Sequence, residues 1–183
     1  MQTHLEHNTQ STQMILPAER APQWYAVRVR SNFERNVSAV LDYKGVEQFL
    51  PMYRSRRIWT DRLKSLNLPL FPGYVFCRIP LEERNRVVTT DGVVGFAGAG
   101  RQPIPVSSTE MDAIRTLVQS ELPAQPWPFL KVGQTVRIGH GSLSGIEGIL
   151  VRVKNSYRLV VSVTLLERSV AVEIDAAYVS PTR

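Results

Sequence analysis

The residue types most often used in catalysis and metal binding are few in this chain and far apart. The histidines are His4, His7 and His140, and the single cysteine is Cys77. A structural zinc site needs about four ligands at short spacings, and a disulfide needs a second cysteine. His140 follows a glycine and precedes another, with no cysteine or carboxylate at ligand spacing. We predict no metal, no cofactor and no disulfide, a solvated His140, and a buried, inert Cys77 thiol.

Sequence motifs for nucleotide binding and nucleophilic catalysis are absent as well. The chain contains no P-loop, no G-x-S-x-G and no H-E-x-x-H sequence. The glycine-rich run from Gly95 to Gly100 lacks the strand–turn–helix context that a phosphate-binding loop requires. Asp61 and the pair Glu82-Glu83 are most simply solvated surface charges. We therefore predict that the chain is not an enzyme and that it acts by binding.

Positive charge is the main compositional feature of the 183 residues. Lys and Arg number 22 against 16 Asp and Glu, which gives a net charge of +6 and a pI of about 9.8. Such a balance indicates an anionic partner, most often nucleic acid. No stretch approaches the ~18 apolar residues of a membrane span, and the first twenty residues do not form a secretory signal. We predict a cytoplasmic monomer with no membrane partner.

Hydrophobic periodicity predicts a first domain over residues 23–119, after a disordered leader at 1–22. Two sequences, Ser31 to Glu34 and Ser107 to Glu110, have the S-x-x-E form of a helix capping box. The predicted order is strand 24–29, helix after Ser31, strand 48–53, exposed hairpin 54–68, strand 74–79, short helix after Pro80, strand 93–96 and helix after Ser107. Without the last helix, this order is typical of a ferredoxin-like α+β domain.

A second domain is predicted over residues 131–183, after a linker at 120–130. The linker contains Pro123, Pro126 and Pro128 and shows little periodicity, which is typical of a semi-stiff connection. Beyond it, residues 135–179 are rich in Val, Ile and Leu, with glycines at 139, 141, 145 and 148 and no helical pattern. Short strands are expected at 135–138, 147–153, 157–163 and 169–174. This pattern indicates a small all-β barrel.

Motifs in both domains resemble the NusG family. Trp24-Tyr25, the run Phe71 to Phe76 and the run Val93 to Phe96 are similar to its N-terminal (NGN) domain. Val136 to Leu150 is similar to a KOW motif, the signature of an SH3-like barrel. The resemblance extends from residue 24 to about residue 180. It implies an NGN domain followed by a KOW barrel, which together promote processive transcription.

The resemblance also implies where RNA polymerase binds. In the family, an apolar surface of the NGN domain binds the clamp helices of the polymerase β′ subunit, and aromatic anchors carry most of such an interface's energy. A second contact reaches the polymerase β subunit. The clamp-helix candidates are Leu50, Pro51, Leu70, Phe71, Pro72, Tyr74 and Phe96, and the β-subunit candidates are Glu83, Arg84, Asn85 and Arg86. Phe71 and Tyr74 are the expected anchors, because strand alternation turns Val75 and Cys77 the other way.

Basic side chains and one tryptophan are the candidates for binding non-template DNA or nascent RNA, since cations neutralise phosphates and aromatic rings stack on bases. They are Arg28, Arg30, Arg35, Arg54, Arg56, Arg57, Trp59, Arg62 and Lys64. In the family, the KOW barrel recruits ribosomal protein S10 or the Rho factor. The aligned candidates here are Ile146, Leu165 and Leu166, and the density of β-branched residues favours the barrel form of this domain over a helical one.

Three interpretations of the function remain at this point. Leu50-Pro51, Trp59 to Arg62 and Pro69 to Phe76 are similar to the specialised UpxY-like paralogues, which implies antitermination in particular operons, such as those for surface polysaccharides. The second interpretation is a housekeeping NusG factor that couples transcription to Rho or to the ribosome. The third, from another class, is a ribosome-associated KOW protein that binds RNA, but it leaves the first domain without a role.

Overall fold

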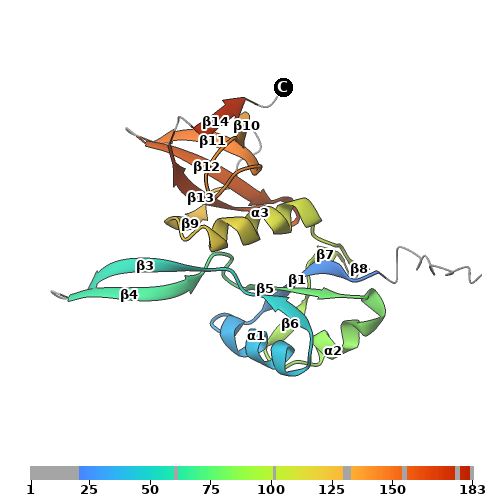
Figure 1. Ribbon diagram of the computed structural model, residues 1–183. Helices are drawn as coiled ribbons and strands as arrows, with labels where there is room; N and C mark the ends of the chain where they lie inside the picture. The colour runs from blue at the N-terminus through green and yellow to red at the C-terminus, as the bar shows by residue number, and fades with distance from the viewer. Residues whose placement is uncertain are drawn as a thin grey trace, which may run out of the picture.

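A computed structural model of the chain describes residues 21–59, 62–100, 102–129, 133–153, 156–175 and 178–181. Figure 1 shows two bodies with helix α3 (Ser108–Gln119) between them. The predicted disordered leader falls mostly on residues 1–20, which lie outside the described residues, as do His4 and His7.

The first body is built on a four-stranded antiparallel sheet. Its strands are β1 (Gln23–Val29), β2 (Glu47–Phe49), β5 (Tyr74–Ile79) and β6 (Val93–Phe96), in the spatial order β2-β5-β1-β6. β1 and β5 form the centre, and Arg28 lies opposite Tyr74. With helices between β1 and β2 and between β5 and β6, this is the ferredoxin-like order that the sequence predicts.

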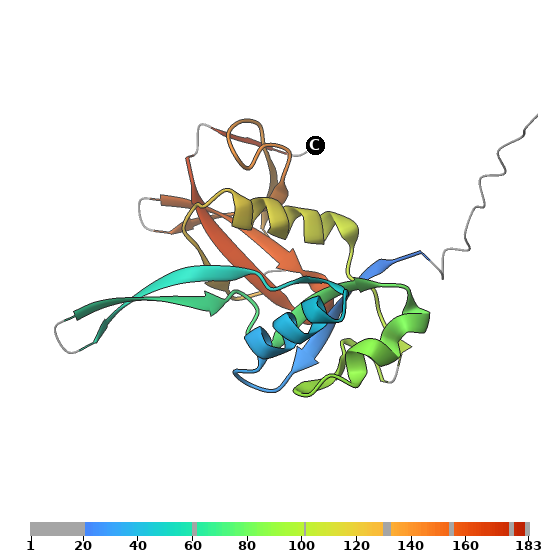
Figure 2. The ribbon, with the colours of Figure 1, turned by 60° about the horizontal axis from the view of Figure 1, so that its bottom comes forward.

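Strand alternation sends the apolar residues of this sheet into two separate cores. Val27, Val75 and Cys77 lie on one face, which is covered by α1 (Glu34–Tyr43) and α2 (Arg84–Val88). The short 3₁₀ helix η1 (Leu81–Glu83) leads into α2. Trp24, Ala26 and Phe76 lie on the other face, against Met111, Ile114 and Leu117 of α3. Figures 1 and 2 show the helices on these two sides.

Neither predicted capping box forms. α1 begins at Glu34 with Phe33 as N-cap residue, and α3 begins at Ser108 with Ser107 as N-cap residue, and neither has a side-chain cap hydrogen bond. Both glutamates bind elsewhere: Glu34 accepts from the Gly73 N–H, and Glu110 accepts from Thr164. The S-x-x-E motifs correctly indicated where the two helices start, but their carboxylates accept hydrogen bonds from donors distant in sequence.

The predicted hairpin is a long two-stranded ribbon that projects from the body (Figures 1 and 2). It consists of β3 (Met52–Trp59) and β4 (Arg62–Pro69), which pair antiparallel. The predicted strand 48–53 is therefore divided: its first part is β2 at the edge of the main sheet, and its last part already belongs to the ribbon. A second, much smaller hairpin follows β6, formed by β7 (Gly98–Ala99) and β8 (Gln102–Pro103).

The second body is the predicted barrel. Its sheet has the order β14-β10-β11-β12-β13-β9 among the described residues. The strands at the four predicted places are β10 (Gln134–Ile138), β11 (Glu147–Val153), β12 (Ser156–Val163) and β13 (Arg168–Ile174), with the 3₁₀ helix η2 (Thr164–Leu166) before β13 and β14 (Val179–Pro181) at the end. The glycine Gly148 of the KOW-like motif has a steric reason, since a Cβ there would lie 2.6 Å from the carbonyl oxygen of Val160.

The prediction that 120–130 is only a linker is wrong for its centre. Residues Ala124–Trp127 form strand β9, which pairs with β13 and sets Pro126 opposite Val170. Proline cannot donate to a ladder and is therefore confined to edge strands, and β9 is an edge of its sheet. Periodicity over four residues is too short to reveal such a strand, because its partner lies more than forty residues further along the chain.

Helix α3 joins the two bodies. Its apolar side belongs to the same buried cluster as barrel residues such as Val161, Val163 and Leu166. The Glu110 carboxylate accepts from the Thr164 hydroxyl at 2.6 Å and from the Thr164 backbone N–H at 3.2 Å. Thus the glutamate of the second S-x-x-E motif ties α3 to the start of η2 in the barrel. None of the described helices is long and apolar enough to cross a membrane.

Candidate functional site

The turn that connects the hairpin to β5 contains the first predicted polymerase anchors. Leu70 and Phe71 are each only 1% exposed. Phe71 packs edge-on against Phe76, with the ring centroids 5.5 Å apart. The prediction that Phe71 is an exposed anchor is therefore wrong, and the same holds for Leu70: both belong to the core between the sheet and α3. The local sequence contains an apolar run, whereas packing in the cluster that includes Phe76 and α3 decides which of its members are covered.

The exposed part of this turn is Pro72 and the half-buried Tyr74. Gly73 takes a positive φ of +84°, although a Cβ there would meet no atom, so the turn requires glycine for its backbone angle rather than for space. The Val29 N–H donates to the Gly73 carbonyl at 2.9 Å, and the Tyr74 N–H donates to the Phe71 carbonyl at 3.1 Å. These bonds fix Pro72 and Tyr74 at the start of β5.

Two of the predicted clamp-helix residues lie away from this turn. Leu50 follows β2 at one edge of the sheet, and Phe96 ends β6 at the opposite edge. Both pack against the core under α1 and α2, where Phe96 contacts the Tyr25 ring edge-on at 5.7 Å. Pro51 is buried. The structure therefore does not gather the seven predicted residues into one exposed patch.

The structure instead places Arg28 beside Tyr74. The two residues are partners across β1 and β5, and Arg28 is exposed. Strand alternation puts Arg28 on the face of the sheet that carries Trp24 and Ala26, which is the α3 face. The resulting surface, formed by Arg28, Pro72 and Tyr74, is called the turn surface below. It combines an aromatic ring with a cation.

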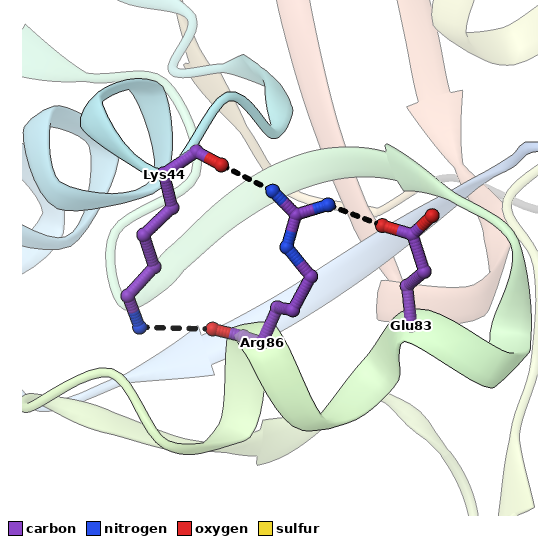
Figure 3. A network of polar contacts seen from close by, with 3 residues as sticks. All are labelled: Lys44, Glu83 and Arg86. Atoms are coloured by element: carbon purple, nitrogen blue, oxygen red, sulfur yellow. Dashed lines mark hydrogen bonds and ion pairs between the residues drawn. The ribbon is translucent and has the colours of Figure 1, made fainter.

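The predicted β-subunit residues lie in η1 and α2. Arg84 and Asn85 are exposed, whereas Arg86 is held in a network with Glu83 and with Lys44 at the end of α1 (Figure 3). Lys44 Nζ donates to the Arg86 carbonyl at 2.9 Å and to the Thr90 hydroxyl at 2.7 Å. This network fixes α2 against α1, so Arg86 and Glu83 have a structural role that the sequence did not reveal, and Arg84 and Asn85 are left toward solvent.

The predicted nucleic-acid residues fall into three groups. Arg28 and Arg54 are exposed. Arg30 is exposed but forms an ion pair with Asp91 at 3.0 Å, and Arg35 donates to the Asn67 carbonyl of β4 at 2.7 Å. The ribbon's backbone pairing sets Arg57 opposite Lys64 and Trp59 opposite Arg62. The side chains of these four residues and of Arg56 lie outside the described part of the structure.

The predicted partner-binding residues of the barrel are largely covered. Ile146 is 6% exposed and Leu166 is 9% exposed, and both belong to the core cluster that includes α3. Leu165, in η2, is half-buried. Residues of α3 and barrel residues such as Ile146 line a shared groove. In this arrangement of the two bodies, Leu165 is the most accessible of the three candidates.

Titration and metal binding add no reactive centre to these surfaces. Burial raises the pKa of the Cys77 thiol to about 12, so the nucleophilic thiolate is suppressed. Burial, with a smaller contribution from Cys77, also raises the pKa of Tyr25. Among the described residues, no three His, Cys, Asp or Glu side chains are grouped so that they could hold a metal ion.

Comparison with protein families decides the identity of the chain. Residues 22–115, which are 94 of the 183 residues, match the family model described as "Transcription termination factor nusG". The chain belongs to the NusG family of transcription termination/antitermination factors.

Relatives within the NusG family match nearly the whole chain. The transcription termination/antitermination protein NusG of Neisseria meningitidis is 29% identical over 177 residues, covering 86% of this chain and 96% of the relative. NusG of Escherichia coli K12 is 28% identical over 173 residues, covering 86% and 94%. A solved structure that describes domain interaction in Thermotoga maritima NusG has a TM-score of 0.57 at 24% identity and covers 90% of this chain and 99% of that one. This last similarity supports the NusG-like fold.

Sequence reasoning missed several residues that shape this NusG-family chain. Glu34 is a buried carboxylate bound to the turn, and its sequence signal pointed to a capping box instead. Arg115 of α3 lies over the rings of Trp24, at 4.5 Å, and Phe49, at 5.6 Å, and forms an ion pair with Glu47. Helical spacing on the polar side of α3 gave no reason to single out this arginine.

Proposed function

We propose that this NusG-family protein binds RNA polymerase at the β′ clamp helices through the turn surface and thereby favours processive, antiterminated transcription. The observation that supports the proposal most directly is the pairing of Tyr74 with Arg28 beside the exposed Pro72. Two backbone hydrogen bonds hold this turn, one accepted by the Gly73 carbonyl and one donated by the Tyr74 N–H. A rigid aromatic group loses little conformational entropy on binding, and a neighbouring arginine adds a cation for acidic groups of the partner.

The second part of the proposal is a contact with the polymerase β subunit through Arg84 and Asn85. These residues are exposed, and the Lys44–Arg86–Glu83 network holds the short helix that carries them. The β′ clamp helices and the β subunit lie on opposite sides of the polymerase cleft. A protein that contacts both sides favours the closed polymerase only if it binds the closed state more tightly than the open one. The rigid connection between α1 and α2 supports such a difference in affinity. Because α2 is held against α1, it cannot move with the β subunit when the polymerase opens.

The third part is contact with non-template DNA or nascent RNA through the β3–β4 ribbon. The ribbon projects from the body, and its pairing brings Arg57 opposite Lys64 and Trp59 opposite Arg62 in the backbone ladder. Arg54, nearer its base, is exposed. Phosphate contacts of this kind depend on salt, since each one releases counterions.

The barrel is proposed to bind ribosomal protein S10 or the Rho factor through Leu165, Leu166 and Ile146. Because Ile146 and Leu166 are buried in the present arrangement, this binding requires that α3 and the barrel separate first. Leu165 remains available for initial contact.

Within the family, we propose the specialised, operon-specific role of the UpxY-like paralogues rather than the housekeeping role. The support is the basic β3–β4 ribbon together with the run Pro69 to Phe76, in which the apolar residues form the core under the turn surface. The housekeeping role predicts a different result in the second experiment below.

The first experiment is co-purification of the full chain with core RNA polymerase. Tyr74→Ala and Arg28→Ala are compared with Tyr43→Ala, because Tyr43 is a 92% exposed tyrosine on α1, the helix that covers the opposite face of the sheet. We expect at least a tenfold weaker recovery for Tyr74→Ala, which corresponds to about 1.4 kcal/mol, and unchanged recovery for Tyr43→Ala. Equal recovery of all variants would show that the turn surface is not the docking site.

The second experiment distinguishes the two roles of the family. Transcription in vitro is followed through a pause site and a Rho-dependent terminator, with the protein added to purified polymerase. The operon-specific role predicts readthrough only on templates that carry the upstream region of its own operon. Equal effects on unrelated templates, or enhanced termination when Rho is present, would favour the housekeeping role.

A further inference from the structure

The first turn of α1 binds two positions that lie more than thirty residues further along the chain. The Glu34 side chain, only 7% exposed, accepts a hydrogen bond from the Gly73 N–H at 2.8 Å. Its neighbour Arg35 donates from Nη2 to the Asn67 carbonyl at 2.7 Å. Gly73 lies in the turn surface's loop, and Asn67 lies near the base of the β3–β4 ribbon. Consecutive residues of one helix therefore bind both ends of the segment 67–73.

This segment is the connection between the ribbon and the main sheet. In the described part of the chain, β3 and β4 pair with each other and with no strand of the main sheet. The Leu70 N–H donates to the Pro51 carbonyl at 2.9 Å, which closes the base of the ribbon. Tyr53 of β3 also packs against the core cluster that contains α3. On the other strand, the Arg35 bond joins β4 directly to α1.

We infer that Glu34 and Arg35, called the α1 brace, are positioning residues that fix the turn surface and the β3–β4 ribbon relative to each other. A buried carboxylate is costly unless it is hydrogen-bonded, so a 7%-exposed Glu34 that accepts the Gly73 N–H stabilises one turn geometry over others. The Arg35 bond is charge-assisted and reaches a backbone carbonyl, so it restrains the strand rather than a mobile side chain.

The α1 brace assigns Arg35 a different role from direct nucleic-acid contact. An arginine that contacts a phosphate contributes to the salt dependence of binding, whereas an arginine that only positions the ribbon does not. The consequence for binding rests on the proposed function, namely that the ribbon binds nucleic acid. The geometric part of the inference does not, because it can be measured in the protein alone.

The first test measures amide hydrogen exchange and backbone order in the full chain by NMR. Glu34→Gln keeps an oxygen that can accept from the Gly73 N–H, whereas Glu34→Ala removes it. We expect exchange of the Gly73 amide to be at least tenfold faster in Glu34→Ala and close to wild type in Glu34→Gln. Exchange in the β5 amides of Val75 and Cys77 reports global stability and should change less than the Gly73 amide.

In the same experiment, Arg35→Ala should lower the order parameters of the β4 amides near Asn67 from about 0.85 toward 0.6 or below, the range of flexible backbone. Asn36→Ala, an exposed neighbour on the same helix, is the matched control and should leave them unchanged. Rapid Gly73 exchange already in the wild-type protein, or unchanged β4 order in Arg35→Ala, would overturn the inference whatever the chain binds.

The second test measures binding to a single-stranded DNA oligonucleotide over a range of salt concentrations. Arg54→Ala removes an exposed cation from the ribbon and should lower the magnitude of the salt slope by about 0.7, the value for one phosphate on a single strand. Arg35→Ala should weaken binding severalfold with an unchanged slope. A slope reduced as in Arg54→Ala would show that Arg35 contacts phosphate, and would overturn its positioning role. No binding by the wild-type chain would count against the proposed function alone, with the NMR result still deciding the α1 brace.

Discussion

The contact between Glu110 and Thr164 predicts how firmly the barrel is held against α3. The Glu110 carboxylate accepts from the Thr164 hydroxyl at 2.6 Å and from its backbone N–H at 3.2 Å. A hydrogen bond to a charged group contributes about 1.5–3 kcal/mol when buried, but this contact is exposed, and exposed charged pairs contribute about 0.2–1 kcal/mol. We therefore expect Glu110→Ala to destabilise the docked arrangement by about 1 kcal/mol, or about fivefold in the docking equilibrium.

A double-mutant cycle in the full chain separates this contact from other effects. Thr164→Val removes the hydroxyl and keeps the N–H, and Glu110→Gln keeps an acceptor without the charge. Docking can be followed by energy transfer between dyes on Asn36→Cys and Ser142→Cys, which are exposed positions on α1 and on the barrel. Cys77 is buried, and because its pKa is raised to about 12 it should not take up dye under neutral conditions.

The expected order of undocking is Glu110→Ala first, then Glu110→Gln, then wild type. The coupling energy between Glu110→Ala and Thr164→Val should be about 0.5 kcal/mol or more, since the two groups contact each other directly. A coupling energy indistinguishable from zero, with unchanged energy transfer in all variants, would refute the reasoning. It would mean that the apolar contacts between α3 and the barrel hold the two bodies alone.

Three further predictions concern the stability of the two bodies. Phe71→Ala should lower the free energy of unfolding by about 3–5 kcal/mol in urea titrations, because the ring is 1% exposed, whereas Pro72→Ala at the exposed neighbour should cost less than about 1 kcal/mol; similar losses would contradict the burial of Phe71. Gly148→Ala should destabilise the barrel by about 1–3 kcal/mol, because a Cβ would lie 2.6 Å from the Val160 carbonyl oxygen, and Ser142→Ala in an exposed loop is the control, expected within about 0.5 kcal/mol. The third prediction is a pH effect of Cys77: its pKa is 9.0 in an exposed thiol and about 12 in the fold, so the folded chain keeps a proton that the unfolded chain releases, and stability should fall as pH rises from about 9 to 12. Cys77→Ser has no thiol to titrate in this range, so an identical alkaline loss of stability in that variant would contradict the prediction.

Much of the fold could be predicted from the sequence because the relevant signals are local. Alternation along residues 74–79 assigned Val75 and Cys77 to one face and Phe76 to the other, and the two clusters confirm this. Gly45 follows α1 with a φ of +69°, the left-handed conformation that glycine commonly takes just after a helix end. The barrel strands lie within a residue or two of their predicted bounds, because each is a run of β-branched residues between glycines or turns.

The candidate site was less predictable, since exposure depends on what packs above a residue. Leu70 and Phe71 follow a hairpin and precede a strand. An apolar pair in this position is compatible with an exposed binding surface and with a buried core. The two residues are buried in a cluster that also contains Phe76 of β5 and residues of α3, which lies more than thirty residues further along the chain. Likewise, Glu34 and Glu110 both lie at the last position of an S-x-x-E motif. The Glu34 carboxylate instead accepts from the Gly73 N–H and the Glu110 carboxylate from the Thr164 hydroxyl, and both donors lie far along the chain.

The sequence by itself determined the two-domain order, the apolar periods and membership of the NusG family, because those properties are carried by residue types at short spacings. The tertiary structure decided which apolar residues remain accessible and which partner each charged side chain takes. Both are properties of distances between segments that no local spacing encodes. The run from Leu70 to Tyr74 shows the difference: its composition is apolar throughout, but its packing buries Leu70 and Phe71 and leaves Pro72 and Tyr74 accessible.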